Sequence, residues 1–207
     1  LKQGAKNCFQ VGLTSVVDAG LGYENILLLD SMHKKDQLKM QIYAMLTPTE
    51  ENFNQIMNKG VYKTDYLHVE SIKLYADGAL GSRGACMIEP YSDDPLNYGL
   101  MVSSYQEMKQ FCLEAEKNGY QVCTHAIGDS ANRSVLKVYG EVLEEKNDKR
   151  WRVEHAQVIH QDDFELFGNL RIKFGHGFKS HPCYKTGISF AEKYWQNGSA
   201  YFWYGAD

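Results

Sequence analysis

Three side chains with metal-binding or basic chemistry lie within short strand-like stretches of the sequence. His125 ends the stretch QVCTH, His155 ends WRVEH, and Lys73 lies inside SIKLYAD. Imidazole nitrogen is a good ligand for zinc, nickel and iron, and side chains at the carboxyl ends of successive parallel strands can converge on one point. The sequence therefore predicts a metal site at His125 and His155. A buried, hydrogen-bonded structural histidine is the alternative at either position.

Lys73 is expected in the interior of a strand, where an ammonium group needs a partner. Burying an unpaired ammonium is costly, so such lysines are usually deprotonated, paired or chemically modified. Asp77 lies just past the same strand, before Gly78. We predict a catalytic set of Lys73, His125, His155 and Asp77, and a turn residue is the alternative for Asp77.

The elements that must position these residues alternate along the chain. Apolar and β-branched runs predict strands at 13–18, 41–46, 69–75, 121–125, 152–155 and 170–174. Helical periodicity and capping signals predict helices at 1–10, 23–38, 105–118, 129–146 and 162–167, and another that begins near residue 47. Such alternation implies right-handed crossovers and a parallel sheet.

This alternation fits two α/β architectures. A closed eight-stranded barrel needs about 250 residues, so six units in 207 residues would be a partial (β/α)8 barrel. An open doubly wound sheet fits the count equally well. The chain opens at Leu1 without a methionine, and we expect both ends to be cut from something longer. The irregular segment 76–101 is long enough to be a functional lid or binding loop, in which Arg83 and Tyr91 are candidate substrate contacts.

Composition bounds the class of protein. With 43% hydrophobic and 23% charged residues, the chain has enough apolar side chains for one core, and we expect one domain over 1–207. A net charge of −4 and a pI near 6.0 predict no nucleic-acid partner. No apolar run approaches the roughly 18 residues of a membrane span, so no membrane partner is expected. Five cysteines, odd in number and without CxxC spacing, favour a reducing, cytoplasmic setting.

The blocks SIKLYADGALGSRGA, EPYSDDP, HAIGDSAN and EHAQ, in this order and spacing, resemble one known family. They look like the YtcJ-like branch of the amidohydrolase superfamily, amidohydrolase family 3, related to N-substituted formamide deformylase. The resemblance implies a (β/α)8 TIM barrel with one or two divalent metal ions, zinc in our prediction. It also implies that Lys73 is carboxylated and bridges the ions, and that His125 and His155 are ligands. A carbamate is an anion, so the modification would remove the problem of a buried ammonium.

The resemblance also implies ligands that the chain lacks. Family members carry an HxH pair on the first barrel strand and an aspartate on the last, so we predict that these two strands are missing here. Asp207 follows the last predicted strand too closely to leave room for a helix, and we do not assign it as a ligand. His181-Pro182-Cys183-Tyr184 stands where the family tends to have Gln-Pro-x-His, and the roles of His176 and His181 stay open.

Three functions from different classes are compatible with these residues. The first is a metal-dependent hydrolase that cleaves non-peptide, amide-type carbon–nitrogen bonds of a small-molecule substrate with metal-activated water. The second is a Schiff-base lyase with Lys73 as the nucleophile, which needs no metal. The third is a non-catalytic fragment of such a barrel that forms a homo-oligomer to cover its sheet edges. The family blocks favour the first function for the parent protein.

Overall fold

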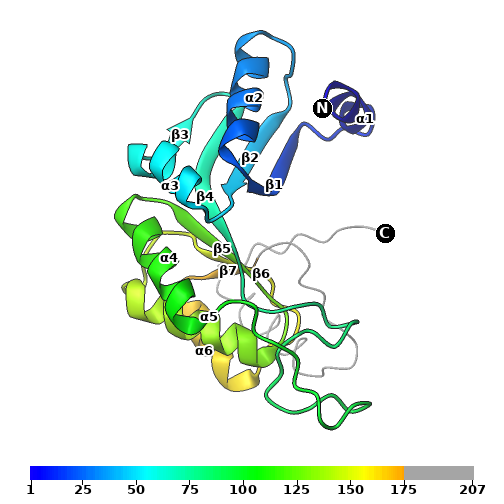
Figure 1. Ribbon diagram of the computed structural model, residues 1–207, viewed down its shortest axis with the longest axis vertical. Coiled ribbons are helices and arrows are strands. Elements are labelled where there is room, and N and C mark those ends of the chain that lie inside the picture. The colour runs from blue at the N-terminus through cyan, green and yellow to red at the C-terminus, as the bar shows by residue number, and fades with distance from the viewer. Residues whose placement is uncertain (175–207) are drawn as a thin grey trace. The chain divides into compact units, whose positions relative to one another are not determined.

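Helices and strands alternate along the chain, and the computed structural model describes residues 1–174 of the 207 (Figure 1). The strands are β1 (Ser15–Leu21), β2 (Gln41–Leu46), β3 (Tyr62–Lys63), β4 (Leu67–Tyr75), β5 (Gln121–Ala126), β6 (Arg152–His155) and β7 (Lys173–Phe174). The α-helices are α1 (Lys2–Gln10), α2 (Tyr23–Lys34), α3 (Glu50–Gln55), α4 (Tyr105–Lys117), α5 (Asp129–Val142) and α6 (Phe164–Asn169). Two short 3-10 helices are η1 (Met57–Lys59) and η2 (Gln161–Asp163).

The strands form one sheet in the order β1-β2-β4-β5-β6-β7, with β3 paired to β4 off this path. The pairs β1–β2, β2–β4 and β6–β7 are parallel, whereas β3 is antiparallel to β4. In the parallel register Val17 lies beside Tyr43, and Tyr43 lies beside His68. The predicted α/β class with a parallel sheet is therefore confirmed.

Capping residues fix where several helices begin and end. The Thr49 hydroxyl oxygen accepts a hydrogen bond from the Asn52 N–H at 3.2 Å, which caps α3. The Ser104 hydroxyl accepts from the Glu107 N–H at 3.2 Å and starts α4 in the same way. Gly119 then ends α4 with a φ of +75°, a left-handed conformation that favours glycine. These local signals explain why α4 leads directly into β5.

Two compact units divide the described chain. The first consists of residues 1–74 and 111–123. The second consists of residues 75–110 and of the chain from residue 124 onward. In the first unit the core contains Ala44, Leu46, Met57, Leu67, Val69 and Ile72. In the second it contains Ala126, Val135, Leu136, Val138, Trp151 and Val153. The single hydrolase domain predicted over 1–207 extends past the described residues and stays a prediction.

Several predicted boundaries differ from the structure, by three or four residues in the following three elements. The helix predicted at 23–38 ends at Lys34, because Asp36 adopts a left-handed φ of 54°. The helix predicted at 129–146 ends at Val142, and Leu143 is extended but still buried, so the apolar pattern outlasts the helix. The strand predicted at 170–174 shrinks to β7, since the residues before it continue from α6 as a turn. Apolar periodicity thus predicts which residues are buried more reliably than it predicts their backbone conformation.

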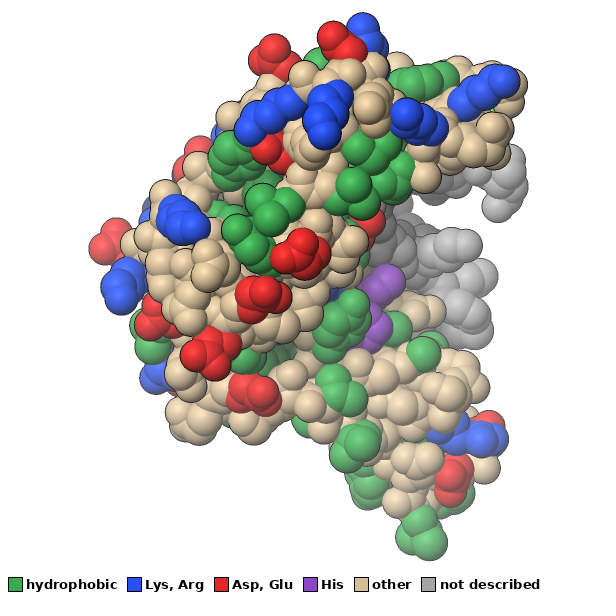
Figure 2. All heavy atoms as spheres, turned by 45° about the horizontal axis from the view of Figure 1, so that its top comes forward, with side chains coloured by type: hydrophobic (Ala, Val, Ile, Leu, Met, Phe, Trp, Pro, Cys, Tyr) green, Lys and Arg blue, Asp and Glu red, His purple; other side chains and the backbone are tan. Residues whose placement is uncertain are grey.

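The surface mixes charged side chains of both signs. Figure 2 shows basic and acidic groups on one face of the molecule, with histidine atoms also reaching the surface. Within residues 1–174 no helix is both long and apolar enough to cross a membrane. Within the described part of the chain, the cysteines at positions 8, 86, 112 and 123 form no disulfide bond.

Candidate metal centre

The two predicted histidine ligands lie side by side in the second unit. His125 is in β5 and His155 ends β6, and their ring centroids are 4.7 Å apart in an edge-to-face arrangement. The His125 side chain is 14% exposed, so a group in solution can reach it. The Tyr75 ring also lies near His125, with the two ring centroids 5.7 Å apart. Two adjacent imidazoles are a donor set that suits a divalent transition metal.

The backbone at His155 is held in an unusual conformation. His155 has a φ of 70° and Ala156 a φ of 43°, both in the left-handed region. For residues with a Cβ this conformation costs on the order of 1–2 kcal/mol each. The Ala156 N–H donates to the Ala126 carbonyl at 3.0 Å and also faces the Glu154 carbonyl at 3.0 Å. The turn that aims His155 is therefore tied to the segment that follows His125.

Asp77 is buried directly beside the histidine pair. Its Oδ1 accepts the Ile127 N–H at 2.9 Å, and its Oδ2 accepts those of Gly128 at 2.8 Å and Cys86 at 2.9 Å. Its Oδ1 also lies 3.5 Å from the His125 Nε2. Burial raises the pKa of Asp77, and the three backbone donors act in the opposite direction. The catalytic role of Asp77 stays a prediction, and its observed contacts are those of an anchor for the backbone.

Lys73 belongs to the first unit, in the part of β4, residues 71–74, that is buried on both faces. The residue is 4% exposed, and its Nζ donates to the Leu74 carbonyl at 3.1 Å. Ser71, Ile72 and Leu74 around it are also buried. The position agrees with the expectation of a lysine inside a strand, and its carboxylation and metal binding stay predictions.

The long segment between β4 and α4 stabilises itself through its polar side chains. Figure 1 draws this part of the second unit as irregular loops. Arg83 makes a two-pronged ion pair with Asp93, at 3.1 and 2.8 Å. The Tyr91 hydroxyl donates to the Ala85 carbonyl at 2.8 Å. Both candidate substrate contacts are thus engaged in holding the loop.

Asn132 is a buried polar residue that the sequence reasoning did not single out. Its Nδ2 lies 2.9 Å from the Gly128 carbonyl oxygen and 3.0 Å from that of Val158. The carbonyls of Ala126 and Ile127 lie within 3.4 and 3.3 Å of the same nitrogen. The available signal was an asparagine on the apolar face of a helix, directly after the HAIGD block.

The described residues do not by themselves form a complete metal site. Among residues 1–174, no group of three or more His, Cys, Asp and Glu side chains is placed to hold a metal ion. A catalytic zinc site usually has three protein ligands, so two histidines need at least one more. His176, His181 and Asp207 lie outside the described residues. Lys73, once carboxylated, is the further donor that the family resemblance implies, and this role stays a prediction.

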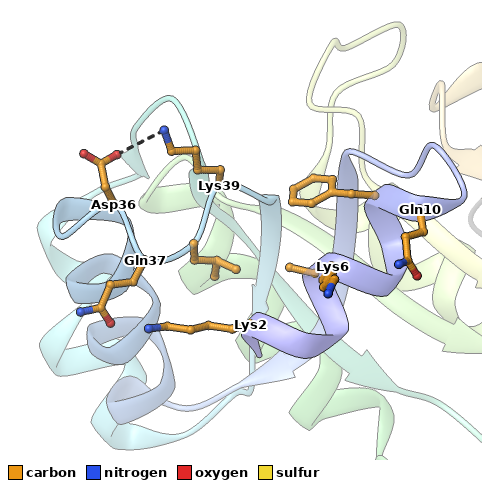
Figure 3. Close-up of a pocket in the computed structure, with 9 residues that line it drawn as sticks. Lys2, Lys6, Gln10, Asp36, Gln37 and Lys39 are labelled. Atoms are coloured by element: carbon orange, nitrogen blue, oxygen red, sulfur yellow. Dashed lines mark ion pairs between the residues drawn. The ribbon is translucent and has the colours of Figure 1, made fainter.

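A pocket of about 540 Å³ lies elsewhere, within the first unit (Figure 3). Lys2, Lys6 and Phe9 of α1 line one side, and Asp36 and Lys39 are on the other. Asp36 and Lys39 form an exposed ion pair at 3.7 Å. The pocket contains none of the predicted site residues, and its exposed lysines carry no feature that selects a ligand.

Comparison with known proteins gives the context of this site. A family model described as "Amidohydrolase family" matches residues 1–193. The chain is 31% identical over 186 residues to Protein LONG AFTER FAR-RED 3 of Arabidopsis thaliana, and the matched region covers 83% of this chain and 32% of that protein. It is 38% identical over 107 residues to the putative amidohydrolase YtcJ of Bacillus subtilis, and this matched region covers 52% of this chain and 20% of that protein.

A solved structure gives the same answer for the fold. An uncharacterized metal-dependent hydrolase from Pyrococcus furiosus superposes with a TM-score of 0.75 and 27% identity, over 84% of this chain and 36% of that one. The chain thus spans between 20% and 36% of the length of these three relatives. The likeness confirms the prediction of a partial TIM-barrel-type fold. The chain belongs to the amidohydrolase family, in its YtcJ-like branch.

Proposed function

We propose that the protein is a metal-dependent hydrolase that cleaves non-peptide, amide-type carbon–nitrogen bonds. The observation that carries this proposal is the adjacency of His125 and His155, whose ring centroids are 4.7 Å apart at the ends of two successive strands. Membership of the amidohydrolase family supports the reaction class. The metal-dependent hydrolase of Pyrococcus furiosus supports the need for a metal.

In this proposal the chain supplies three of the ligands. His125 and His155 bind through neutral imidazole nitrogens, and zinc, the ion that we predict, is among the metals that such ligands suit. Lys73 reacts with carbon dioxide as an unprotonated amine, forms a nitrogen–carbon bond and releases a proton, which leaves a carbamate anion. When bound, a divalent ion supplies an acidic water with a pKa near 7 and polarises the substrate carbonyl. The remaining ligands come from outside the described residues.

The proposed substrate is a small molecule, and the chain's loops would decide which one. Tyr75 is 48% exposed beside His125, so its ring is available to contact a substrate. The relation to N-substituted formamide deformylase, the cytoplasmic location and a homo-oligomeric state belong to the same proposal.

Metal content tests the proposal directly. The full-length protein, purified with bicarbonate present, should contain about one or two equivalents of divalent metal. We expect His125→Ala and His155→Ala to lose most of it. His68→Ala is the matched control, because its imidazole is 34% exposed and lies near Glu70 rather than near the histidine pair. Elemental analysis of the four proteins, after the same dialysis, gives the answer.

Two results would contradict the proposal. A parent protein without metal, under conditions that supply both zinc and bicarbonate, would exclude the metal centre. Metal retained in both His125→Ala and His155→Ala would place it elsewhere. Trapping of a carbonyl compound on Lys73 by borohydride, without metal, would instead favour the Schiff-base lyase.

A further inference from the structure

Buried polar side chains hold the peptide groups after His125 from two sides. Asp77 accepts the N–H groups of Ile127 and Gly128, at 2.9 and 2.8 Å. Asn132 directs its Nδ2 at the carbonyls of the same segment, of which Gly128 at 2.9 Å is the nearest. Asp77 is 2% exposed and Asn132 is 0% exposed. In segment 126–128, two N–H groups and the three carbonyls are therefore held by side chains that water barely reaches.

The two side chains have complementary polarity that suits this task. A carboxylate can only accept hydrogen bonds, and Asp77 faces three N–H groups. The amide nitrogen can only donate, and that of Asn132 faces carbonyl oxygens only. The Asn132 Oδ1 is buried without a hydrogen-bond partner among the described residues. An unpaired buried acceptor is costly, so the orientation of this amide is set by its carbonyl partners.

The same contacts reach the segment after His155. Asn132 also approaches the Val158 carbonyl at 3.0 Å, and the Val158 N–H donates to the Ile127 carbonyl at 2.9 Å. The Ala156 N–H bonds to the Ala126 carbonyl at 3.0 Å. Because His155 and Ala156 have left-handed φ angles, this turn needs neighbours that hold it in place.

The loop after β4 completes the arrangement. Asp77 also binds the Cys86 N–H at 2.9 Å, so one carboxylate joins that loop to the segment after His125. The approach is close, since a Cβ on Gly128 would lie 2.0 Å from the Cys86 carbonyl oxygen. Small changes at Asp77 would therefore be transmitted to the backbone that carries His125.

We propose that Asp77 and Asn132 are positioning residues that clamp segment 126–128 and thereby fix the two imidazoles in the geometry that a metal needs. The metal part of this inference rests on the proposed function, whereas the clamp itself does not. Residues that orient metal ligands typically change metal affinity about 10- to 100-fold when they are replaced. Asp77 and Asn132 would act in this way through the backbone, without touching the ion.

Isosteric substitutions exchange one terminal atom of each side chain, an acceptor for a donor in Asp77→Asn and a donor for an acceptor in Asn132→Asp. Asp77→Asn places an amide against N–H groups, and Asn132→Asp places a carboxylate against carbonyl oxygens. Asp163→Asn is the matched control, because Asp163 is 5% exposed and binds Arg133, at 2.8 Å, rather than segment 126–128. Asn132→Ser is a milder second variant for the case in which Asn132→Asp does not fold.

Two measurements on the full-length protein separate the clamp from the metal. Hydrogen exchange by mass spectrometry should show about tenfold faster exchange in peptides that cover residues 124–132 for the Asp77 and Asn132 variants, since buried hydrogen bonds that oppose local opening are lost. Zinc affinity, measured by competition with a chelator, should fall about 10- to 100-fold in the same variants. Asp163→Asn should lower stability but leave both readouts at the parent's values.

The outcomes distinguish the two proposals. Exchange and affinity unchanged in both Asp77→Asn and Asn132→Ser would overturn the clamp while the metal centre stands. Faster exchange in a protein that never binds metal would retain the clamp and reject the proposed function. Equal losses in Asp163→Asn would also overturn the clamp, because they would show that any buried polar change has the same effect.

Discussion

Helices α1 and α5 are both amphipathic, yet they have opposite surroundings. α1 buries none of its residues, whereas α5 buries six, among them Asn132, Leu136 and Tyr139. The neighbouring strands repeat the contrast, because every residue of β1 is at least partly exposed and most of β5 is buried. An apolar stripe is thus enough to predict a helix, but it stabilises the fold only when a neighbouring element buries it.

The difference matters for the candidate site. The histidine pair lies where α5 and the loops around it are packed, and Asp77 and Asn132 bind backbone there. Near α1 the structure has a pocket with exposed lysines and an exposed ion pair, which are well solvated groups. A preorganised metal site needs a packed environment like that around α5, because ligands stay in a fixed position only when their backbone is fixed.

Truncation of one apolar side chain in each helix gives the largest expected contrast. Leu136→Ala in α5 should lower the free energy of unfolding by about 4 kcal/mol, because it removes a side chain that is 1% exposed and leaves a cavity. Phe9→Ala in α1 should change it by no more than about 0.5 kcal/mol, since Phe9 is 42% exposed. Urea unfolding followed by circular dichroism measures both, and similar losses would show that α1 is packed as tightly as α5.

Much of the fold could be predicted because periodicity and turn signals are local. Strand β2 begins and ends where its apolar run does, and β6 coincides with the predicted 152–155. Strand β3 was missed, since two residues leave no pattern to detect and its pairing with β4 is a tertiary event. The early end of α5 was missed for the converse reason, because Leu143 is buried without being helical.

The site was only partly predictable. The types and strand-end positions of His125 and His155 pointed to a shared site, and the structure places them together. The partners of Asp77 could not be foreseen, because they lie up to 51 residues away along the chain. Asn132 resembles an ordinary helix residue until the carbonyls of four separate residues are placed around it. Local sequence identifies candidate ligands, whereas the residues that hold them depend on the packed structure.

A glycine in each region provides the next contrast. Gly128→Ala should cost about 3 kcal/mol, because its Cβ would lie 2.0 Å from the Cys86 carbonyl oxygen, a backbone atom that cannot rotate away. Gly4→Ala in α1 meets no atom within 4 Å. It should therefore stabilise the protein by about 0.5–1 kcal/mol, as alanine does in a helix. Thermal unfolding of the two variants against the parent tests the signs, and destabilisation by Gly4→Ala would mean that α1 has neighbours.

A tyrosine beside β5 gives the smallest effect, which is visible only at alkaline pH. Tyr120 is 1% exposed, donates to the Gly60 carbonyl at 3.0 Å, and has its pKa raised to about 12 by burial and by the charge of Glu70. Because the unfolded value is near 10, the neutral phenol stabilises the fold below about pH 10, and this contribution is lost as the pH rises towards 12.

Between about pH 9 and pH 11, the free energy of unfolding of Tyr120→Phe should therefore fall by roughly 1 kcal/mol less than that of the parent. Tyr98, which is 49% exposed, provides the control, and Tyr98→Phe should keep the parent's slope. Urea midpoints at the two pH values give both slopes. A parent slope retained in Tyr120→Phe would mean that this phenol ionises as readily in the folded protein as in the unfolded one. Burial next to β5 would then be looser than the packing around α5 implies.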